Sequence, residues 1–536
     1  MILILLLPAM LCAEQRPLRD VLMDLALEDY EDPEGLLNEL GSHGDPFIKE
    51  FVESWRTGEV LLLERGPDQP PLVLHRYAEE YHDLESDAVV SLTQAEEESL
   101  SKARPSRKLR RELVKIIDTI DLANPNEQVR IDAARKLGLS RNEEYIPVLQ
   151  RRLGAEESAR ARRALEEAII INQLDRTEAT EDIMEAVVRL GDLKSVAGRD
   201  LVEDYLEAAE ESGNEELAAA SRRALRRIDE HMAWVEQLGN RFRGMSLGSV
   251  LLMVSFGLAI TFGLMGIINM AHGEFIAIGG YTCYLVQNAF AAAFGPQSAA
   301  YQWFFIVSLP VSFVVAALIG IGFEKSFIRF LYRRPLESLL ATWGLSMVMQ
   351  QVYRLVFGAA NVQVNTPGLL VGNFELWGAS LSYTRIFVIG FAILTVIATW
   401  LLLTRTNLGL YIRAVMQNRH MAASLGIPVS RVNTLTFAFG CGLASLAGVV
   451  LSQLGNVGPS MGQAYIVDSF MVVVAGSVGN LLGAGVSAMG IGLVDQFLQP
   501  AMGPVMGKIT VFAVIILFLQ WKPGGLFPTK SRSLED

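Results

Sequence analysis

Polar residues interrupt the apolar second half of the sequence at two places. Asn269, His272 and Glu274 occur together in the segment NMAHGE, between two long apolar runs, and Asp468 lies inside another apolar run nearer the C-terminus. An unpaired charge in hydrocarbon costs at least about 2.5 kcal/mol on insertion scales, so such residues mark functional or paired positions. NMAHGE is therefore either a turn at the cytoplasmic surface or a polar break lining a pathway. Asp468 is either a pathway residue or gate, or a paired structural charge.

Small residues recur along the same apolar runs. In lipid, close backbone approach through small residues supplies much of the packing between helices. Glycines around Asn480 also allow a helix to break, and transporters expose polar backbone groups to their substrates at broken helices. The small residues form three groups: Gly257, Gly263 and Gly266; Gly440, Ala444 and Gly448; Gly476, Gly479, Gly483 and Gly485. The predicted substrate pathway comprises Asn269, His272, Glu274, Asp468, Gly476, Gly479 and Asn480.

The sequence does not indicate enzymatic chemistry. No nucleophile, base and orienting group occur together, and Gly507-Lys508 lacks the upstream glycine and the Ser or Thr of a phosphate loop. The cysteines, Cys12, Cys283 and Cys441, suit neither a disulfide framework nor a metal site. We therefore expect no catalytic residue, no metal and no cofactor bound by this chain. The net charge of −13 argues against a nucleic-acid partner.

The two halves of the 536-residue chain suit different solvents. Charged residues crowd into the first ~240 positions, whereas long apolar runs follow from Ser246, as a bilayer requires. The expected fold class is all-α, with a polytopic bundle of about eight or nine membrane spans after an exported, mostly helical soluble region. The predicted spans are 247–268, 275–294, 304–323, 339–356, 386–403, 434–454 and three crossings within 466–519, interrupted near Asn480 and Pro500.

Positive charges gather in three places, and Lys and Arg are concentrated in cytoplasmic loops. The three groups are Lys325, Arg329, Arg333 and Arg334; Arg405, Arg413, Arg419 and Arg431; Lys522, Lys530 and Arg532. The connectors 358–384 and 455–464 contain no Lys or Arg and should face outside. We expect a multi-pass protein of the cell (inner) membrane, with the soluble region periplasmic or otherwise extracytoplasmic and the C-terminus cytoplasmic.

The sequence suggests five segments. Residues 1–13 are typical of a signal peptide, with an uncleaved anchor or a misassigned start as the alternatives. Residues 14–104 form a mixed helical segment with a small hairpin over Gly58 to His75, turning at residues 66–70. Residues 105–240 carry amphipathic helices in units of roughly 40 residues that resemble HEAT-type repeats, either docking a partner or serving as a structural cap. Residues 246–528 form the membrane-spanning domain, and 529–536 form a cytoplasmic tail.

Four segments carry a resemblance to a known family. They are GLAITFGLMGIINMAHGEFIAIGGY, RRPLESLLATWGLSMVMQQ, TNLGLYIRAVMQNRHMAASLGIPVSRVNTLTFAFGCGLASLAGVV and VVVAGSVGNLLGAGVSAMGIGLVDQFL. Together they resemble permeases of ABC importers of the branched-chain amino acid and urea class, from about residue 246 to residue 528. NMAHGE, SQLGNVGPSMGQAYIVDSFMVVV, the ending KPGGLFP and the soluble extension are most similar to the urea permease subunit.

The resemblance implies an importer driven by separate ATPase subunits through alternating access. It also implies a second, related permease subunit and an extracytoplasmic solute-binding protein as partners. The family's ATPase contact would fall on the basic loop, where residues 413–427 form one short helical stretch; a surface helix on anionic lipid is the alternative. This predicted ATPase-coupling helix comprises Arg413, Ala414, Asn418, Arg419, Met421, Ala422, Leu425 and Gly426.

Urea is the expected solute. Because urea is neutral, its pathway needs hydrogen-bonding groups and no fixed countercharge, which favours Asn269 and Asn480 over Glu274 as direct contacts. A branched-chain amino acid is the alternative solute, and it would need groups for both an ammonium and a carboxylate. A membrane sensor with a ligand-binding solenoid is a third hypothesis, which predicts a cytoplasmic output domain.

Overall fold

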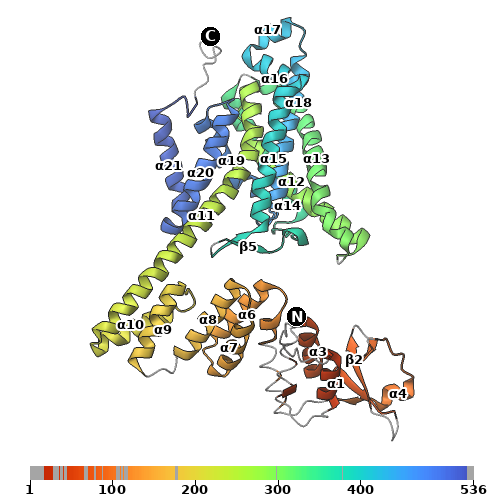
Figure 1. Cartoon of the computed structure of the whole chain (residues 1–536). Helices are drawn as coiled ribbons and strands as arrows, with labels where there is room; N and C mark the ends of the chain where they lie inside the picture. The colour runs from red at the N-terminus through yellow and green to blue at the C-terminus, as the bar shows by residue number, and fades with distance from the viewer. Residues whose placement is uncertain are drawn as a thin grey trace, which may run out of the picture. The chain divides into compact units, whose positions relative to one another are not determined.

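The structure is a computed structural model of the chain (Figure 1). It describes residues 17–27, 35–36, 40, 45–65, 71–77, 80–86, 88–103, 109, 113, 119–174, 179–296, 298–332, 334–376 and 378–527. The chain divides into two compact units, Met1–Met232 and Ala233–Asp536, which are described separately. The predicted signal peptide, the hairpin turn at 66–70, Arg333 and the predicted tail 529–536 lie outside the described residues.

The first unit begins with helices packed on a small sheet. The helices are α1 (Leu18–Leu27), α3 (Pro46–Thr57) and α4 (Gln94–Ser99); the strands are β1 (Val60–Leu63), β2 (Leu72–Tyr77), β3 (Glu80–Asp83) and β4 (Ser101–Lys102). The strands are antiparallel, in the order β3-β2-β1-β4. The β1–β2 pair forms the strands of the predicted hairpin, with Leu62 opposite Val73. β3 and β4 were not predicted, because they are short and lack apolar alternation.

The described residues between 119 and 232 lie mostly in helices joined by short turns, as predicted. The helices are α6 (Glu127–Leu139), α7 (Ile146–Ala155), α8 (Ala159–Leu174), α9 (Thr180–Leu193) and α10 (Arg199–Ser212), with 3-10 turns η1 (Asp121–Ala123) and η2 (Glu143–Tyr145). Asn126 caps α6 by accepting from the Gln128 N–H. A Cβ at Gly138 would lie 2.9 Å from the Ala168 Cα, so a small residue lets α6 and α8 pack closely. The HEAT-type arrangement of these helices stays a prediction.

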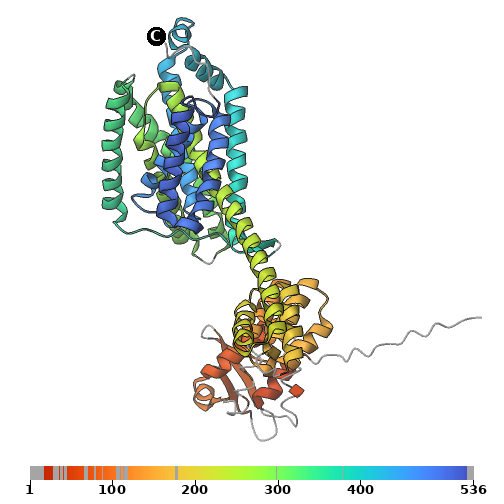
Figure 2. The ribbon, with the colours of Figure 1, turned by 90° about the vertical axis from the view of Figure 1, so that its left-hand side faces the viewer.

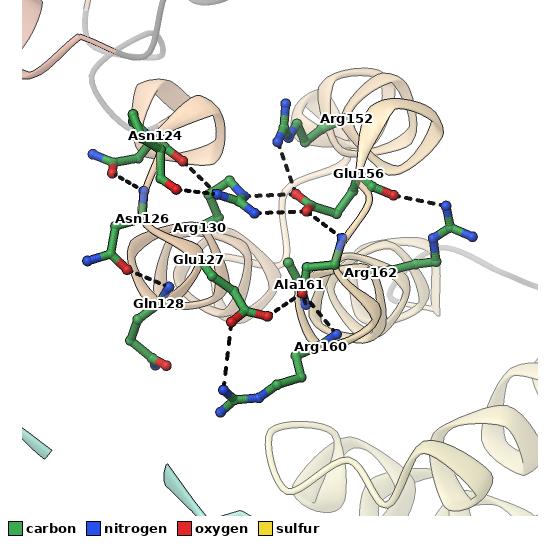
Figure 3. Close-up of polar contacts among 12 residues, drawn as sticks. Asn124, Asn126, Glu127, Gln128, Arg130, Arg152, Glu156, Arg160, Ala161 and Arg162 are labelled. Atoms are coloured by element: carbon green, nitrogen blue, oxygen red, sulfur yellow. Dashed lines mark hydrogen bonds and ion pairs between the residues drawn. The ribbon is translucent and has the colours of Figure 1, made fainter. Parts of the chain in front are cut away.

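One buried carboxylate joins α6 to the α7–α8 turn (Figure 3). Glu156 is 2% exposed, and its Oε1 and Oε2 accept 2.9 Å hydrogen bonds from Arg130 Nη2 and Nε. Arg152 Nη2 adds a 3.0 Å bond, and the Ser158 N–H donates to Oε1 over 3.0 Å. Burial raises the pKa of Glu156, but these donors and the Arg130 charge outweigh burial and lower the pKa to about 2.

A 51-residue helix, α11 (Glu215–Met265), begins in the first unit and ends in the second. The sequence predicted separate segments on either side of residues 241–245, where the structure has no break. The helix continues because Gly239, Gly244 and Gly248 keep helical conformation and no proline occurs between residues 215 and 265. Gly244 and Gly248 also bring α11 close to the backbone of α20 (Leu481–Met502), at Leu493 and Met489.

The second unit is a helical bundle (Figures 1 and 2). After α11 its helices are α12 (Glu274–Phe294), α13 (Phe304–Ser326), α14 (Pro335–Phe357), α15 (Tyr383–Arg405), α16 (Asn407–Gln417), α17 (Arg419–Ser424), α18 (Val429–Leu451), α19 (Met461–Gly476), α20 and α21 (Pro504–Trp521). Short 3-10 turns are η3 (Met270–Gly273), η4 (Ala299–Trp303), η5 (Ile328–Leu331) and η6 (Gly368–Leu370).

Six helices of the described part of the chain have the length and apolar composition of membrane spans. They are α11, α13 with the preceding η4, α15, α18, α20 and α21. α12 and α14 are long enough but more polar, since they carry residues such as Glu274 and Gln350, and α19 is a shorter apolar helix of 16 residues. Of the eight or nine spans predicted, six therefore correspond to helices of the described residues that are long and apolar enough to cross a membrane.

Three details of the bundle differ from or add to the prediction. The break expected near Pro500 is centred on Gly503, which has φ 82°, because Pro500 is accommodated within the last turn of α20. Residues 413–427 do not form one helical stretch: they contain the end of α16 and the whole of α17, because Asn418 between them adopts an extended conformation and caps α17. The connector after α14 contains an unpredicted hairpin, β5 (Asn373–Leu376) and β6 (Ala379–Ser382).

Glycines bring the helices of the bundle into backbone contact, as the small-residue pattern predicts. A Cβ at Gly448 of α18 would lie 1.9 Å from the Ile276 carbonyl oxygen of α12. One at Gly257 of α11 would lie 2.5 Å from the Gly440 carbonyl oxygen of α18. α18 therefore packs against both α11 and α12 at van der Waals distance, which places the NMAHGE segment inside the bundle.

Candidate functional site

NMAHGE forms a buried break between α11 and α12. Asn269 caps η3, with its Oδ1 accepting from the Ala271 N–H over 3.1 Å. The Met270 N–H donates to Thr342 Oγ1 of α14 over 3.0 Å, so α14 supplies a partner to the interrupted backbone. Asn269, His272 and Glu274 are all buried. Burial favours a polar break within the bundle over an exposed turn.

Glu274 is held by side chains of α14. Its Oε1 accepts hydrogen bonds from Ser346 Oγ over 2.7 Å and from Gln350 Nε2 over 2.9 Å. Tyr353 Oη donates to the Glu274 backbone carbonyl over 3.0 Å. We name Glu274, Ser346, Gln350 and Tyr353 the Glu274 cluster. All four residues are buried, and Glu274 itself is 1% exposed.

The α14 residues of this cluster were not among the predicted site residues. Thr342, Ser346 and Gln350 are spaced by four residues, which places them on one face of a helix, and Tyr353 lies one turn further along. A polar stripe of this period within a predicted membrane span is a signal that could have revealed them. It was overlooked because none of these side chains is charged.

Four polar side-chain atoms of the break have no hydrogen-bond partner within the described structure. They are Glu274 Oε2, an acceptor, Asn269 Nδ2, a donor, and the two ring nitrogens of His272. Buried polar groups in proteins are nearly always paired, so unpaired ones need an explanation. The donors to Glu274 are neutral, since no Lys or Arg of the described chain bonds to it. The site can therefore offer hydrogen bonds to a polar solute without a cationic group.

His272 lies where α11 and α18 cross. It is fully buried, and a Cβ at Gly257 would lie 3.0 Å from His272 Nε2. Its ring centroid lies 6.5 Å from that of Phe275. His272 is therefore packed among helices next to the Glu274 cluster.

Asp468 belongs to a different group of residues. Lys508 Nζ of α21 lies 3.2 Å from its Oδ2, so Asp468 is a paired charge in this structure. Asp495 of α20 is buried nearby and accepts from Gln499 Nε2 over 2.6 Å. Asp468, Lys508 and Asp495 line a small pocket with apolar side chains of α11, α19, α20 and α21, which we name the charged pocket. None of the pocket residues belongs to the Glu274 cluster.

The Gly476 to Asn480 segment is hydrogen-bonded to the C-terminal end of the described chain. Asn480 Oδ1 accepts from the Gly483 N–H over 3.1 Å and caps α20, while its Nδ2 donates to the Phe527 carbonyl over 3.3 Å. Gly479 has φ 79° and lies against Met416 of α16, and a Cβ at Gly476 would meet the Gly483 backbone at 2.4 Å. Both ends of the Asn480 amide are thus engaged in structural hydrogen bonds.

The predicted coupling residues divide between an exposed and a buried face. Met421 is 59% and Leu425 78% exposed, whereas Ala422 is 3% exposed and packs into the bundle core. Arg413 is exposed and donates to the Leu403 carbonyl at the end of α15, while Ala414 is half-buried.

The remaining members shape the ends of α17. Asn418 caps α17 by accepting from the Met421 N–H over 2.9 Å. The Arg419 guanidinium lies over the ring of Tyr332, 5.3 Å from its centroid. Gly426, with φ 82°, follows α17 in a left-handed conformation that favours glycine.

Comparison with known proteins extends over the second unit. Residues 240–519 match the family described as branched-chain amino acid transport system / permease component. The permease LivH of Salmonella typhimurium, named for high-affinity branched-chain amino acid transport, is 27% identical over 300 residues, covering 54% of this chain and 94% of LivH. The similarly named BraD of Pseudomonas aeruginosa is 27% identical over 305 residues, covering 55% of this chain and 95% of BraD.

A shorter similarity extends to a sugar permease. The ribose import permease protein RbsC of Escherichia coli is 30% identical over 142 residues, which cover 25% of this chain and 43% of RbsC. No solved structure matches the chain. The family match covers more than half of the chain, including the NMAHGE break, the α16–α17 segment and the charged pocket. This chain therefore belongs to the branched-chain amino acid transport permease family and is a multi-pass membrane permease component of an ABC transport system.

Proposed function

We propose that the chain is the permease subunit of an ABC importer for urea. An ABC permease component binds no cofactor and works with ATPase and solute-binding partners, and we add a second, related permease subunit. In this proposal α12, α14 and α19 also cross the membrane, giving nine spans with the six described above. The basic loops and C-terminus face the cytoplasm, and the first unit lies outside.

The unpaired atoms of Glu274 and Asn269 carry the proposal for urea, so Glu274 becomes a direct contact beside Asn269, which the sequence had not favoured. Urea has four N–H donors and one carbonyl acceptor, and it has no charge. Glu274 Oε2 can accept from such donors, and Asn269 Nδ2 can donate to the carbonyl oxygen. A branched-chain amino acid would bring a carboxylate, which needs a cationic partner that the described Glu274 cluster lacks. We therefore place Asn269, His272 and Glu274 on the pathway, while Asp468, Gly476, Gly479 and Asn480 stay predictions.

The second candidate solute is a branched-chain amino acid. The relatives LivH and BraD are named for its transport. The charged pocket also combines carboxylates and the Lys508 ammonium with apolar side chains such as Leu251 and Ile491. These charge types are the ones that an amino-acid zwitterion needs, although Asp468 and Lys508 pair with each other and the pocket is too small for such a molecule in this structure.

Uptake by the complete complex separates the two candidates. The permease, its ATPases and its binding protein are reconstituted in proteoliposomes, and ATP-dependent accumulation of radiolabelled urea and leucine is measured. We expect urea to accumulate and excess unlabelled leucine to leave its uptake unchanged. Accumulation of leucine that urea does not inhibit would assign the amino-acid function instead.

The α16–α17 segment supports coupling to the ATPase. Met421 and Leu425 are one turn apart and exposed, and Arg413 is exposed on the preceding helix. An exposed apolar pair at this spacing is the anchor by which a short helix enters a groove on a partner. We propose that Met421 and Leu425 dock into the ATPase and that Ala422 holds α17 against the bundle.

A further inference from the structure

A further buried carboxylate, outside the sites described so far, lies at the end of α13. Glu324 is 1% exposed, and both of its oxygens accept hydrogen bonds. Tyr332 Oη donates to Oε1 over 2.5 Å, and Thr434 Oγ1 donates to Oε2 over 2.6 Å. Glu324 is in the last turn of α13, Tyr332 follows η5, and Thr434 is near the start of α18. One carboxylate therefore joins three segments of the chain.

Tyr332 connects this carboxylate to α17. The Arg419 guanidinium, on the first residue of α17, lies 5.3 Å from the Tyr332 ring centroid, within the range of cation–π attraction. Contacts thus continue from the exposed α17 through Arg419 and Tyr332 to Glu324. A parallel contact, Arg329 Nη2 to Ser430 Oγ at 3.4 Å, links η5 to α18 on the same side.

The helices joined by Glu324 reach the Glu274 cluster through tight packing. A Cβ at Gly442 of α18 would lie 2.4 Å from the Phe313 ring of α13, so the two helices interlock. Gly448 of α18 contacts Ile276 of α12 at backbone distance, two residues from Glu274. Packed helices move as rigid elements, so a shift of α18 is transmitted to α12.

We propose that Glu324 and Tyr332 are positioning residues that transmit movement of α17 into α13 and α18 during transport. The proposal rests on the proposed docking of the ATPase at α17. When the ATPases close and displace α17, Arg419 moves the Tyr332 ring. The Tyr332 hydroxyl donates to Glu324 Oε1 while Thr434 of α18 donates to Oε2, so α13 and α18 follow the movement of the ring through this buried carboxylate.

The Tyr332→Phe variant tests this link in the complete complex. It removes the hydroxyl donor and keeps the ring beneath Arg419. Proteoliposomes are assayed for ATP hydrolysis and for uptake of radiolabelled urea and leucine. We expect ATPase assembly and the KM for ATP to be unchanged, and uptake per ATP hydrolysed to fall about tenfold, within the usual range of allosteric coupling. Tyr383→Phe, at an exposed tyrosine of α15, is the matched control and should behave as wild type.

Further variants separate this link from the docking surface and from misfolding. Arg419→Ala should lower the same ratio, and its combination with Tyr332→Phe should have no larger effect than the stronger single variant, because both act in one chain of contacts. The proposal is overturned if Tyr332→Phe leaves uptake per ATP hydrolysed unchanged. If Tyr332→Phe does not assemble, an unchanged value in Arg419→Ala overturns it instead. Additive effects of the two substitutions in the double variant would also overturn it. If Leu425→Asp still binds the ATPase, the docking surface itself is wrong, whatever the ratio in Tyr332→Phe.

Discussion

At the scale of single residues, the hydrogen bonds of Glu274 are unequally divided. Oε1 accepts from two side chains of α14, and Oε2 has no partner within the described structure. The hydrogen bonds to Oε1 fix the orientation of the carboxyl group. Oε2 remains able to accept a hydrogen bond from a solute. This division suits a site that must bind a solute and release it, because the carboxyl group stays in place in both states.

Glu274→Gln should weaken urea uptake. The amide oxygen can keep the bonds to Ser346 and Gln350, while an NH2 group replaces the acceptor Oε2. We expect the KM for urea to rise about 10- to 100-fold, as the loss of a hydrogen bond to a charged group implies. The measurement is the concentration dependence of uptake. Glu337→Gln, at an exposed glutamate of the same helix α14, serves as the control. An unchanged KM would remove Glu274 from the pathway.

Glu156 stabilises the first unit in a pH-dependent manner. Its pKa is about 2 in the folded protein and 4.5 ordinarily, so folding favours the ionised form. The sign follows from linkage: the stabilisation of roughly 3 kcal/mol is fully present above pH 4.5 and is lost as the pH falls toward 2. Glu156→Gln should therefore destabilise α6–α8 by about 3 kcal/mol at pH 7, since it leaves Arg130 without its countercharge.

Amide hydrogen exchange of the full-length protein measures the effect of Glu156. Protection of α6 and α8 should fall in Glu156→Gln at neutral pH and should depend less on pH between 5 and 3 than in wild type. Glu157→Gln is a matched control, because the neighbouring side chain is exposed. Equal protection in the two variants would show that the network adds no stability.

Residue-scale prediction from sequence worked where a charge marked the site. Glu274 stood out in an apolar sequence, and the structure buries it. Ser346 and Gln350 did not stand out, because neutral polar residues are common in membrane helices and only their periodicity on α14 is informative. Glu324 was missed because it lies next to Lys325 at the end of a span, where charges usually face water.

At the scale of elements, apolar run length located the helices of the second unit closely. The run predicted at 275–294 is the helix Glu274–Phe294, and the run at 304–323 is Phe304–Ser326. Breaks were harder to predict, because they depend on capping and on local conformation. Pro500 stays within α20, whereas Asn418 divides α16 from α17. A single capping residue is much harder to recognise in a sequence than a run of about twenty apolar residues.

The two faces of α17 should respond oppositely to a charge. Leu425→Asp places a carboxylate on the exposed side, so we expect normal folding and about 30-fold weaker ATPase binding, as for loss of an interface anchor. Ala422→Asp buries a charge in the bundle core and should lower thermal stability in detergent. Ala423→Asp, exposed on the same helix, should leave stability unchanged.

Two measurements separate these effects at α17. Co-purification with the ATPase subunits reports docking, and a thermal melt of the purified permease reports folding. Normal ATPase binding by Leu425→Asp, with the melt unchanged, would exclude Leu425 as an anchor. A wild-type melt for Ala422→Asp would show that α17 moves away from the bundle.

At the scale of the whole molecule, the connectors of the second unit separate by charge. Arg329 of η5 contacts Ser430 in the first turn of α18, next to Arg431, so two of the basic connectors lie together. The connectors without Lys or Arg meet elsewhere, at the paired backbones of Val362 and Val457. The sequence predicted this separation from charge alone. The sequence did not predict that α11 is one continuous helix. The periodicity of apolar residues indicates a helix on each side of residues 241–245, but it does not indicate whether the two are joined.

The separation of connectors leads to a prediction of orientation. Basic connectors stay on the cytoplasmic side, so β6 and the first unit should face outside. Cysteines placed at the exposed positions Ser380, Ser212 and Ser424 of a Cys12→Ser background test this, since the remaining Cys283 and Cys441 are buried. The cells are treated so that a maleimide reaches the outer face of the inner membrane but cannot cross it. This reagent should label Ser380→Cys and Ser212→Cys in intact cells and should label Ser424→Cys only after lysis. The reverse labelling pattern would show that the protein has the opposite orientation in the membrane. Met421 and Leu425 would then lie outside the cytoplasm, where no ATPase subunit could reach them, and the proposed coupling surface would be excluded.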